Sequence, residues 1–442
     1  MTGFRGIAIP DRGNYWLRRA RVPRCFLAQS GPDSPVDAEG VPLLDIFIRD
    51  GRIAAVTAAE ESGSDAIDLN GYHLWPALID MHVHLDKGQV LPRVVADGTF
   101  ERARTETVQD RLRWNREDLE CRMRFALRCA YVHGVSGIRT HLDSYPALAP
   151  TSWSLFQKLR AEWAGRISLQ AVSLVPISTY TSDYGRELAN LVAESGGILG
   201  GATNDIDHRD PAVAEATDIA LDHMFRLARE RALDIDLHTD QDAALGAFTL
   251  PRIARAVLRN GFRGRVVCSH CVNLVLQPEA VMRETIALCA DARIAVATMP
   301  IPMVYLQDRA DGRTPRWRGF TALHELRAGG VVVVIGGDNC RDAWYPYGDN
   351  DMVDTLQQAV RLLQLDRPLG DAPSLAAPIP ADVMREPTLG RVAVGSPAHL
   401  ILFNARTINH VMCRPQADRI VLSGGVRVTE TLPDYDELGS GS

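Results

Sequence analysis

The hydrophobic pattern of the chain changes near residue 78, where short apolar runs begin to alternate with longer amphipathic stretches. The apolar runs are rich in valine and isoleucine, which is typical of strands buried on both faces. The longer stretches 117–132, 213–231 and 250–260 have the length and period of helices. The predicted strands are 78–84, 136–142, 167–175, 198–203, 233–238, 265–270, 293–299 and 331–337. This βα alternation favours an α/β fold of the (β/α)8 TIM barrel type over a doubly wound sheet.

The two ends of the chain have a different texture from the middle. Near the start, the alternating residues 45–48 are followed by an Asp-Gly turn and by the run 52–56, which together predict a β-hairpin. Strand-like runs return at 398–403 and 419–428, after a proline-rich stretch. We therefore predict a small β-sandwich domain formed by residues 1–75 plus 385–442, with the barrel, residues 76–384, inserted between the two segments.

Polar side chains gather where the predicted strands end. Barrel enzymes place their active sites at this face, so these residues are the first candidates for chemistry. They are His82 and His84, His141 and Asp143, Asn204 and Asp205, His238 and Asp240, His270, and Asp338.

His82 and His84 are the first of these candidates along the chain. Residues two apart in a strand point to the same face, so the two imidazoles aim at one point. Neutral imidazole is the commonest protein ligand for a transition metal. An isolated pair of this kind is also compatible with two surface histidines beside a turn. The later histidines and Asp338, each at the end of its own apolar run, favour a metal site.

Composition and charge limit the possible functions. Of the 442 residues, 46% are hydrophobic and 23% charged, as in an ordinary globular protein, and the formal net charge is −7. The absence of a basic stripe argues against nucleic acid as a partner. No stretch approaches the roughly 18 apolar residues of a membrane span, and the start lacks the apolar core of a secretory signal. The eight cysteines are scattered, which suggests reduced thiols. We expect a cytoplasmic protein that contacts no membrane.

Five motifs together resemble the amidohydrolase superfamily, within it the cytosine deaminase-like branch, over nearly the whole chain. They are PALIDMHVHLDK (76–87), GIRTHLDS (137–144), DIDLHTD (234–240), VVCSHC (266–271) and GGDNCRDAWYPYGDNDM (336–352). The resemblance implies one divalent metal ion held by His82, His84, His238 and Asp338, with His270 beside the metal-bound water. No lysine stands at the end of the fourth strand, which fits a one-metal site. Relatives commonly assemble, so we expect a homo-oligomer.

The chemistry of this residue set agrees with the resemblance. Three imidazoles and a carboxylate provide four ligands and leave a position for water, and they suit Zn²⁺ and Fe²⁺ alike. A metal bound there lowers the pKa of its water to about 7, so that hydroxide forms at neutral pH. We expect this hydroxide to attack an sp² carbon bearing an amino group. Asp338 is the candidate base, and His270 the candidate donor to the developing charge.

Position 241 departs from the pattern of typical cytosine deaminases. Those enzymes have a proton-shuttling glutamate where this chain has Gln241, and a carboxamide cannot exchange a proton at neutral pH. Asp240 and Lys87 are the candidates to replace it. A lysine follows the first-strand motif in N-isopropylammelide amidohydrolase-like members, which also lack the glutamate and remove an alkylamine from a triazine.

The remaining candidates concern substrate binding. We expect His141, Gln241, Asn339, Asp342 and Trp344 to contact a small planar heterocycle, although support of neighbouring groups is an equal alternative for several of them. Pro176 stands near the position where a glutamine is expected to read a pyrimidine edge, so cytosine itself is in doubt.

The sequence thus predicts a metal-dependent hydrolase that removes an amino or alkylamino group from a small N-heterocycle, a pyrimidine or triazine. One alternative is hydrolysis of a non-peptide amide or urea-type C–N bond. Another is a substrate-binding pseudoenzyme, because Gln241 replaces the usual acid.

Overall fold

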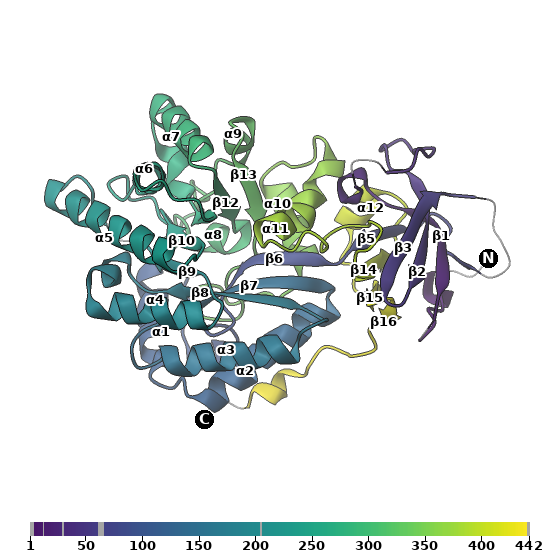
Figure 1. The fold of residues 1–442 in the computed structure, drawn as a ribbon, viewed down its shortest axis with the longest axis horizontal. Coiled ribbons are helices and arrows are strands. Elements are labelled where there is room, and N and C mark those ends of the chain that lie inside the picture. Colours follow the sequence, from purple (N-terminus) through teal and green to yellow (C-terminus); the bar gives the residue numbers. More distant parts are fainter. Residues whose placement is uncertain (1–3, 12, 29–30, 61–65, 204–205, 440–442) are drawn as a thin grey trace.

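A computed structural model describes residues 4–11, 13–28, 31–60, 66–203 and 206–439. Figure 1 shows strands from both ends of the sequence together at one end of the molecule, and the larger α/β region at the other. None of the helices in the described ranges is long and apolar enough to cross a membrane.

The small sheet combines the two ends of the chain. Its strands run in the order β16-β15-β14-β5-β1-β2-β3, with β4 paired to β1, as one connected sheet. The aromatic rings of Phe26, Trp75 and Phe403 pack together in its core. Its strands are β1 (Tyr15–Arg21), β2 (Leu43–Arg49), β3 (Arg52–Ala58), β4 (Ala66–Asp68), β5 (His73–Pro76), β14 (Leu400–Phe403), β15 (Ile420–Ser423) and β16 (Val426–Arg427).

Eight parallel strands form the centre of the α/β region. Strands β6 to β8 make one sheet and β9 to β13 another, each in chain order. Isolated parallel bridges join Val172 to Ile198, between β8 and β9, and Val83 to Asp338, between β6 and the residues after β13. The strands are β6 (Leu78–Val83), β7 (Val135–Asp143), β8 (Ser168–Leu174), β9 (Leu199–Ala202), β10 (Ile235–Thr239), β11 (Val266–His270), β12 (Ile294–Thr298) and β13 (Val332–Ile335).

Most of the helices connect these strands and pack on the outside of the sheets; the last three follow the final parallel strand, and the last of them lies beside the small sheet (Figure 1). Their apolar faces bury leucine, isoleucine and valine against the strands, as in Ile253 and Val257 of α6. The helices are α1 (Phe100–Arg111), α2 (Arg116–Val132), α3 (Ala149–Glu162), α4 (Asp183–Glu194), α5 (Pro211–Glu230), α6 (Leu250–Arg259), α7 (Glu279–Asp291), α8 (Pro300–Leu306), α9 (Leu323–Ala328), α10 (Met352–Leu362), α11 (Pro378–Val383) and α12 (Ile408–Cys413).

The observed strands β6 to β13 fall on the eight predicted runs, with ends that differ by at most two residues. The helices predicted from periodicity correspond to α2, α5 and α6. Two candidates at the end of the fourth strand, Asn204 and Asp205, lie outside the described residues. Helix α1 was not predicted, because its residues are mostly charged or polar and carry no apolar stripe.

Candidate active site

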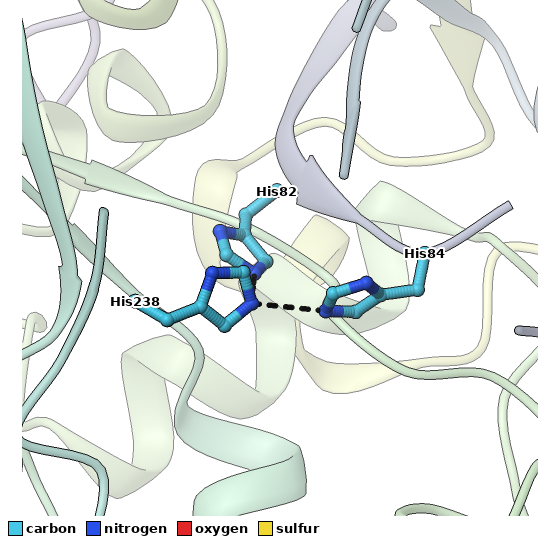
Figure 2. A group of neighbouring side chains, drawn as sticks. All are labelled: His82, His84 and His238. Carbon is cyan, nitrogen blue, oxygen red and sulfur yellow. Dashed lines mark hydrogen bonds between the residues drawn. The ribbon is translucent and has the colours of Figure 1, made fainter. Parts of the chain in front are cut away.

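The carboxyl ends of three strands bring four candidate metal ligands to one point. His82 and His84 project from β6 and the residue after it, and His238 from β10. His238 Nε2 lies 3.2 Å from Nε2 of His82 and 3.2 Å from Nε2 of His84. Figure 2 shows the three rings converging on this point. Asp338 Oδ1, after β13, lies 3.3 Å from His84 Nε2 and 3.6 Å from His82 Nε2.

These four residues fit a divalent metal ion. Zinc ligands about 2.0–2.1 Å from the ion in a tetrahedron lie about 3.3 Å from one another, close to the separations observed here. Both carboxylate oxygens of Asp338 are buried and have no hydrogen-bond partner among the described residues, as expected of a carboxylate that binds a metal ion. Burial, followed by the neighbouring imidazoles, lowers the pKa values of His82 and His238 well below their ordinary value. These two imidazoles are therefore neutral, the form that binds metals.

Two of the site residues adopt a backbone conformation that is unusual for their type. His270 has φ of 73° and Asp338 has φ of 66°, both in the left-handed region. Such a conformation costs on the order of 1–3 kcal/mol and is concentrated at functional sites. Here it ends strand β11 at His270 and turns the chain after β13 at Asp338, so that both side chains are buried beside His82.

A series of buried hydrogen-bonded side chains holds the ring of His82 on the side away from the metal site. Ser269 Oγ lies 2.9 Å from His82 Nδ1 and 3.3 Å from Asp236 Oδ1, and Asp236 forms a 2.8 Å ion pair with Arg139. A partner on Nδ1 fixes the imidazole so that Nε2 faces the metal site. His141 stacks on His82 with ring centroids 3.9 Å apart and is fully buried. The structure thus places His141 behind the ligands, outside the residues that line the substrate-sized cavity described below.

His270 is paired with Gln241, the residue that replaces the usual glutamate. Gln241 Nε2 lies 2.7 Å from His270 Nε2. Because an amide N–H can only donate, this contact requires His270 Nε2 to be unprotonated. Burial, opposed by Asp338, lowers the pKa of His270 to about 4, in agreement with a neutral ring. The tautomer set by Gln241 leaves Nδ1 of His270 as its N–H donor.

A cavity of about 280 Å³ opens directly over the ligands. This volume lies just below the usual range of about 300–1,000 Å³ for small-molecule sites. His84 and His238 form its base, and residues from several loops, strand ends and helix α1 form its walls. The wall residues are Lys87, Arg104, Thr107, Val108, Arg111, Asp143, Tyr145, Leu174, Val175, Pro176, Ala202, Gln241, Asn339 and Trp344.

Lys87 is held in the cavity wall by Asp143. Its Nζ lies 3.0 Å from Asp143 Oδ1, and the backbone N–H of Asp143 donates to Asp86 Oδ2 at 2.7 Å. Burial lowers the pKa of Lys87, but the charges of Asp143 and Asp86 outweigh this effect and raise the pKa above its ordinary value. Lys87 therefore carries a proton at neutral pH.

Asp342 does not line the cavity but fixes two residues that do. Its carboxylate accepts from Asn339 Nδ2 at 2.7 Å and from the backbone N–H groups of Trp344 and Tyr345 at 2.8 and 2.9 Å. The indole N–H of Trp344 donates to Thr107 Oγ1 at 2.8 Å. We therefore assign Asp342 a supporting role in place of the direct substrate contact expected from the sequence.

Asp240 lies at the start of helix α6 instead of in the cavity. Its carboxylate accepts from the backbone N–H groups of Thr249 and Leu250 at 2.7 and 3.0 Å. The left-handed backbone of Asp240, φ 50°, turns the residue away from the strand direction that places His238. The structure thus supports a helix-capping role for Asp240, in place of the predicted share in proton transfer.

Asp240 should give the stability of the fold a pH dependence. Burial raises its pKa to about 7, against about 3.9 in an unfolded chain, so its contribution to stability falls as pH rises between these values. We expect Asp240→Asn to cost about 1–2 kcal/mol at pH 5 and clearly less at pH 8, because only the wild type loses stability on ionisation. Urea unfolding at both pH values measures this difference. An equal cost at both would show that Asp240 does not titrate in this range.

The α1 residues in the cavity wall were not predicted from the sequence. Arg104, Thr107, Val108 and Arg111 reach the site from a helix that lies outside the strand-end pattern. Spacing alone could not find them, because they belong to an inserted helix with no apolar stripe. The THLDS motif (140–144) contains Asp143, which Arg111 of this helix contacts, and the HLDK motif (84–87) contains Lys87, which binds the same carboxylate.

Known proteins resemble this chain in sequence and in fold. Residues 189–429 match the amidohydrolase family. Pterin deaminase from Rhizobium rhizogenes is 42% identical over 435 residues, which cover 97% of each chain. N-isopropylammelide isopropyl amidohydrolase from Pseudomonas sp. is 26% identical over 374 residues, covering 82% of this chain and 87% of that protein. The crystal structure of 5-methylcytosine deaminase from Klebsiella pneumoniae is 22% identical, with a TM-score of 0.79 over 94% of this chain and 98% of that one.

The strand-end ligand set, the cavity above it and these similarities define the class of protein. The chain belongs to the amidohydrolase family. It is a hydrolase of carbon–nitrogen bonds, and its reaction is the metal-dependent hydrolytic deamination of an N-heterocycle.

Proposed function

We propose that the protein removes the 2-amino group of a pterin as ammonia. The observation that carries this proposal is the similarity to a pterin deaminase, 42% identical over nearly the full length of both chains. A pterin is a planar bicyclic ring that bears a cyclic amidine at C2. This is the kind of C–N bond that the predicted chemistry hydrolyses, and it extends the predicted substrate from one ring to two.

The residues that line the cavity support the choice of a pterin. Trp344 and Tyr145 give it aromatic surface for a flat ring, and Val175 and Val108 add apolar surface. The Lys87 ammonium and the amides of Gln241 and Asn339 offer hydrogen-bond donors to ring nitrogens and the 4-oxo group. The site therefore combines apolar faces with a few placed polar groups, as small-molecule sites do.

His82, His84, His238 and Asp338 would hold one divalent ion, zinc or iron. Bound there, the ion would supply acidity to water and polarise the reacting carbon. Asp338, with its free oxygen beside the three imidazoles, accepts the proton of the attacking water. His270, kept neutral and buried beside His82 and Asp338, is the proposed hydrogen-bond donor to the oxygen that adds to C2.

Lys87 takes over the role of the missing glutamate in this proposal. Its ammonium lines the cavity above His84 and holds a proton that it donates to the ring nitrogen adjacent to C2. Water thus adds to C2 as the ring nitrogen is protonated. The amino group then leaves as ammonia with the proton that Asp338 accepted. The C2 hydroxyl returns its proton to Lys87, and a ring carbonyl remains at C2. Gln241 orients His270 and moves no proton.

We infer further that strands β6 to β13 close into a (β/α)8 barrel. The two isolated bridges that connect β8 to β9 and β13 to β6 support this closure. A closed ring places the ends of β6, β10, β11 and β13 around one axis, which accounts for the convergence of the ligands on one point.

A panel of aminoheterocycles tests the proposed substrate. We expect ammonia and the 2-oxo product from pterin, with kcat/KM at least about 100-fold above that for cytosine, because the cavity contacts of the second ring are lost with the smaller substrate. The panel includes an N-alkylaminotriazine, since a relative that acts on N-isopropylammelide is 26% identical. Alkylamine release from the triazine without ammonia release from pterin would overturn the pterin assignment.

A further inference from the structure

Helix α1 forms one wall of the substrate cavity with little apolar packing of its own. Of its twelve residues only Ala103, Thr107 and Asp110 are buried. Polar contacts hold it in place. Trp344 donates to Thr107 at 2.8 Å, and Arg93 pairs with Asp110 at 2.6 Å. A segment with few buried apolar contacts opens at low free energy, so the position of α1 depends on these polar contacts.

A third polar contact joins α1 to Asp143, whose carboxylate also binds Lys87. Arg111, the last residue of α1, binds Asp143 Oδ2 through Nε at 2.9 Å and Nη2 at 2.5 Å. Lys87 Nζ binds the other oxygen, Oδ1, at 3.0 Å. Asp143 is 2% exposed, and its backbone N–H donates to the carboxylate of Asp86. The Asp143 carboxylate is therefore fixed between Arg111 and Lys87. The guanidinium of Arg111 also stacks over Tyr145, 4.4 Å from the ring centroid.

We propose that Arg111 is a positioning residue that couples the closure of the cavity by α1 to the placement of Lys87, acting through Asp143. The inference rests on the proposed role of Lys87 in the deamination.

The coupling follows from the sharing of one charge by two cations. With α1 docked, Nε and Nη2 of Arg111 both donate to Oδ2 of Asp143 and neutralise part of its charge. Lys87 then contacts only Oδ1 and keeps two N–H groups for the substrate. With α1 displaced, Asp143 interacts with Lys87 alone and draws its ammonium toward the cavity wall. The lysine is therefore placed for proton donation only when the cavity is closed.

A double-mutant cycle between Arg111 and Lys87 tests the coupling. We expect Arg111→Met to lower kcat by about 30-fold in the wild type, and by less than about 3-fold in a Lys87→Met background, because the effect runs through Lys87. Arg111→Lys should recover part of kcat, since one cationic contact to Asp143 returns. The matched control is Arg93→Met, which removes the Arg93 contact to α1 without touching Asp143. We expect it to raise KM with kcat changed by less than about 2-fold, because saturating substrate keeps α1 docked and Arg111 still contacts Asp143 in this variant.

Two kinetic outcomes would overturn the proposal. Losses of equal size in both Lys87 backgrounds would show that Arg111 acts independently of the lysine. If Arg111→Met changed only KM, as expected for Arg93→Met, Arg111 would line the cavity without positioning Lys87. Hydrogen exchange of the α1 amides gives a readout without turnover, and faster exchange in both Arg111→Met and Arg93→Met is expected. Unchanged exchange in Arg111→Met would also contradict the account. The cycle uses whichever aminoheterocycle the wild type deaminates, so failure of the pterin assignment leaves this test intact.

Discussion

Asp338→Asn should lower kcat by about 10⁴-fold or more and weaken metal binding by at least about 10²-fold. The carboxylate is both a ligand, 3.3 Å from His84 Nε2, and the acceptor of the water proton. An amide accepts no proton and carries no charge to offset that of the ion. Metal content after dialysis and kcat at saturating metal measure the two effects separately. Asp222→Asn, which changes an exposed carboxylate on α5, is the matched control.

The same variant separates an enzyme from a binding protein. Gln241 stands where related deaminases have a glutamate, and this replacement could have left a barrel that binds heterocycles without catalysis. In that case the wild type would show no turnover, and Asp338→Asn would change the metal content alone. Retained deamination in Asp338→Asn at full metal occupancy would contradict the assignment of Asp338 as the proton acceptor.

Lys87→Met should lower kcat by about 10²–10³-fold while metal content stays at the wild-type level. Methionine keeps most of the length of the side chain but removes the ammonium that faces the cavity. The chain has two lysines, so Lys158→Met is a natural control. Lys158 lies on the surface of α3 and pairs with Glu120 at 2.6 Å. We expect this control to change kcat by less than about 2-fold.

Lys87→Met also tests what replaces the glutamate of related deaminases. Suppose that Lys87→Met keeps the kcat of the wild type while Asp338→Asn is inactive. Another group would then donate the proton, and the proposed coupling between Arg111 and Lys87 would lose its basis. A loss seen only in KM would make Lys87 a binding residue.

The strands and the metal ligands could be read from the sequence because both follow a simple pattern. Each buried parallel strand is a continuous apolar run, and His82, His84 and His238 come where such runs end. The carboxyl ends of parallel strands in this fold meet at one face, so spacing in the sequence is enough to bring these residues together.

Other parts of the site depend on turns and on an inserted helix, which the periodicity of hydrophobic residues does not predict. Asp240 follows His238 by two residues, yet a left-handed turn directs its carboxylate to the start of α6. Arg111 and Thr107 lie on a polar helix whose position is set by single contacts with Asp143 and Trp344. Contacts of this kind form between distant segments and leave no local signal in the sequence.

A metal titration of pterin turnover tests the central claim most directly. Metal-free protein is supplied with increasing amounts of zinc or iron, and the initial rate of ammonia release from pterin is measured at each step. We expect a rate that rises linearly and reaches its plateau at one metal ion per chain, because His82, His84, His238 and Asp338 form one four-ligand site. Full ammonia release from the metal-free protein, or a plateau at two ions per chain, would contradict it.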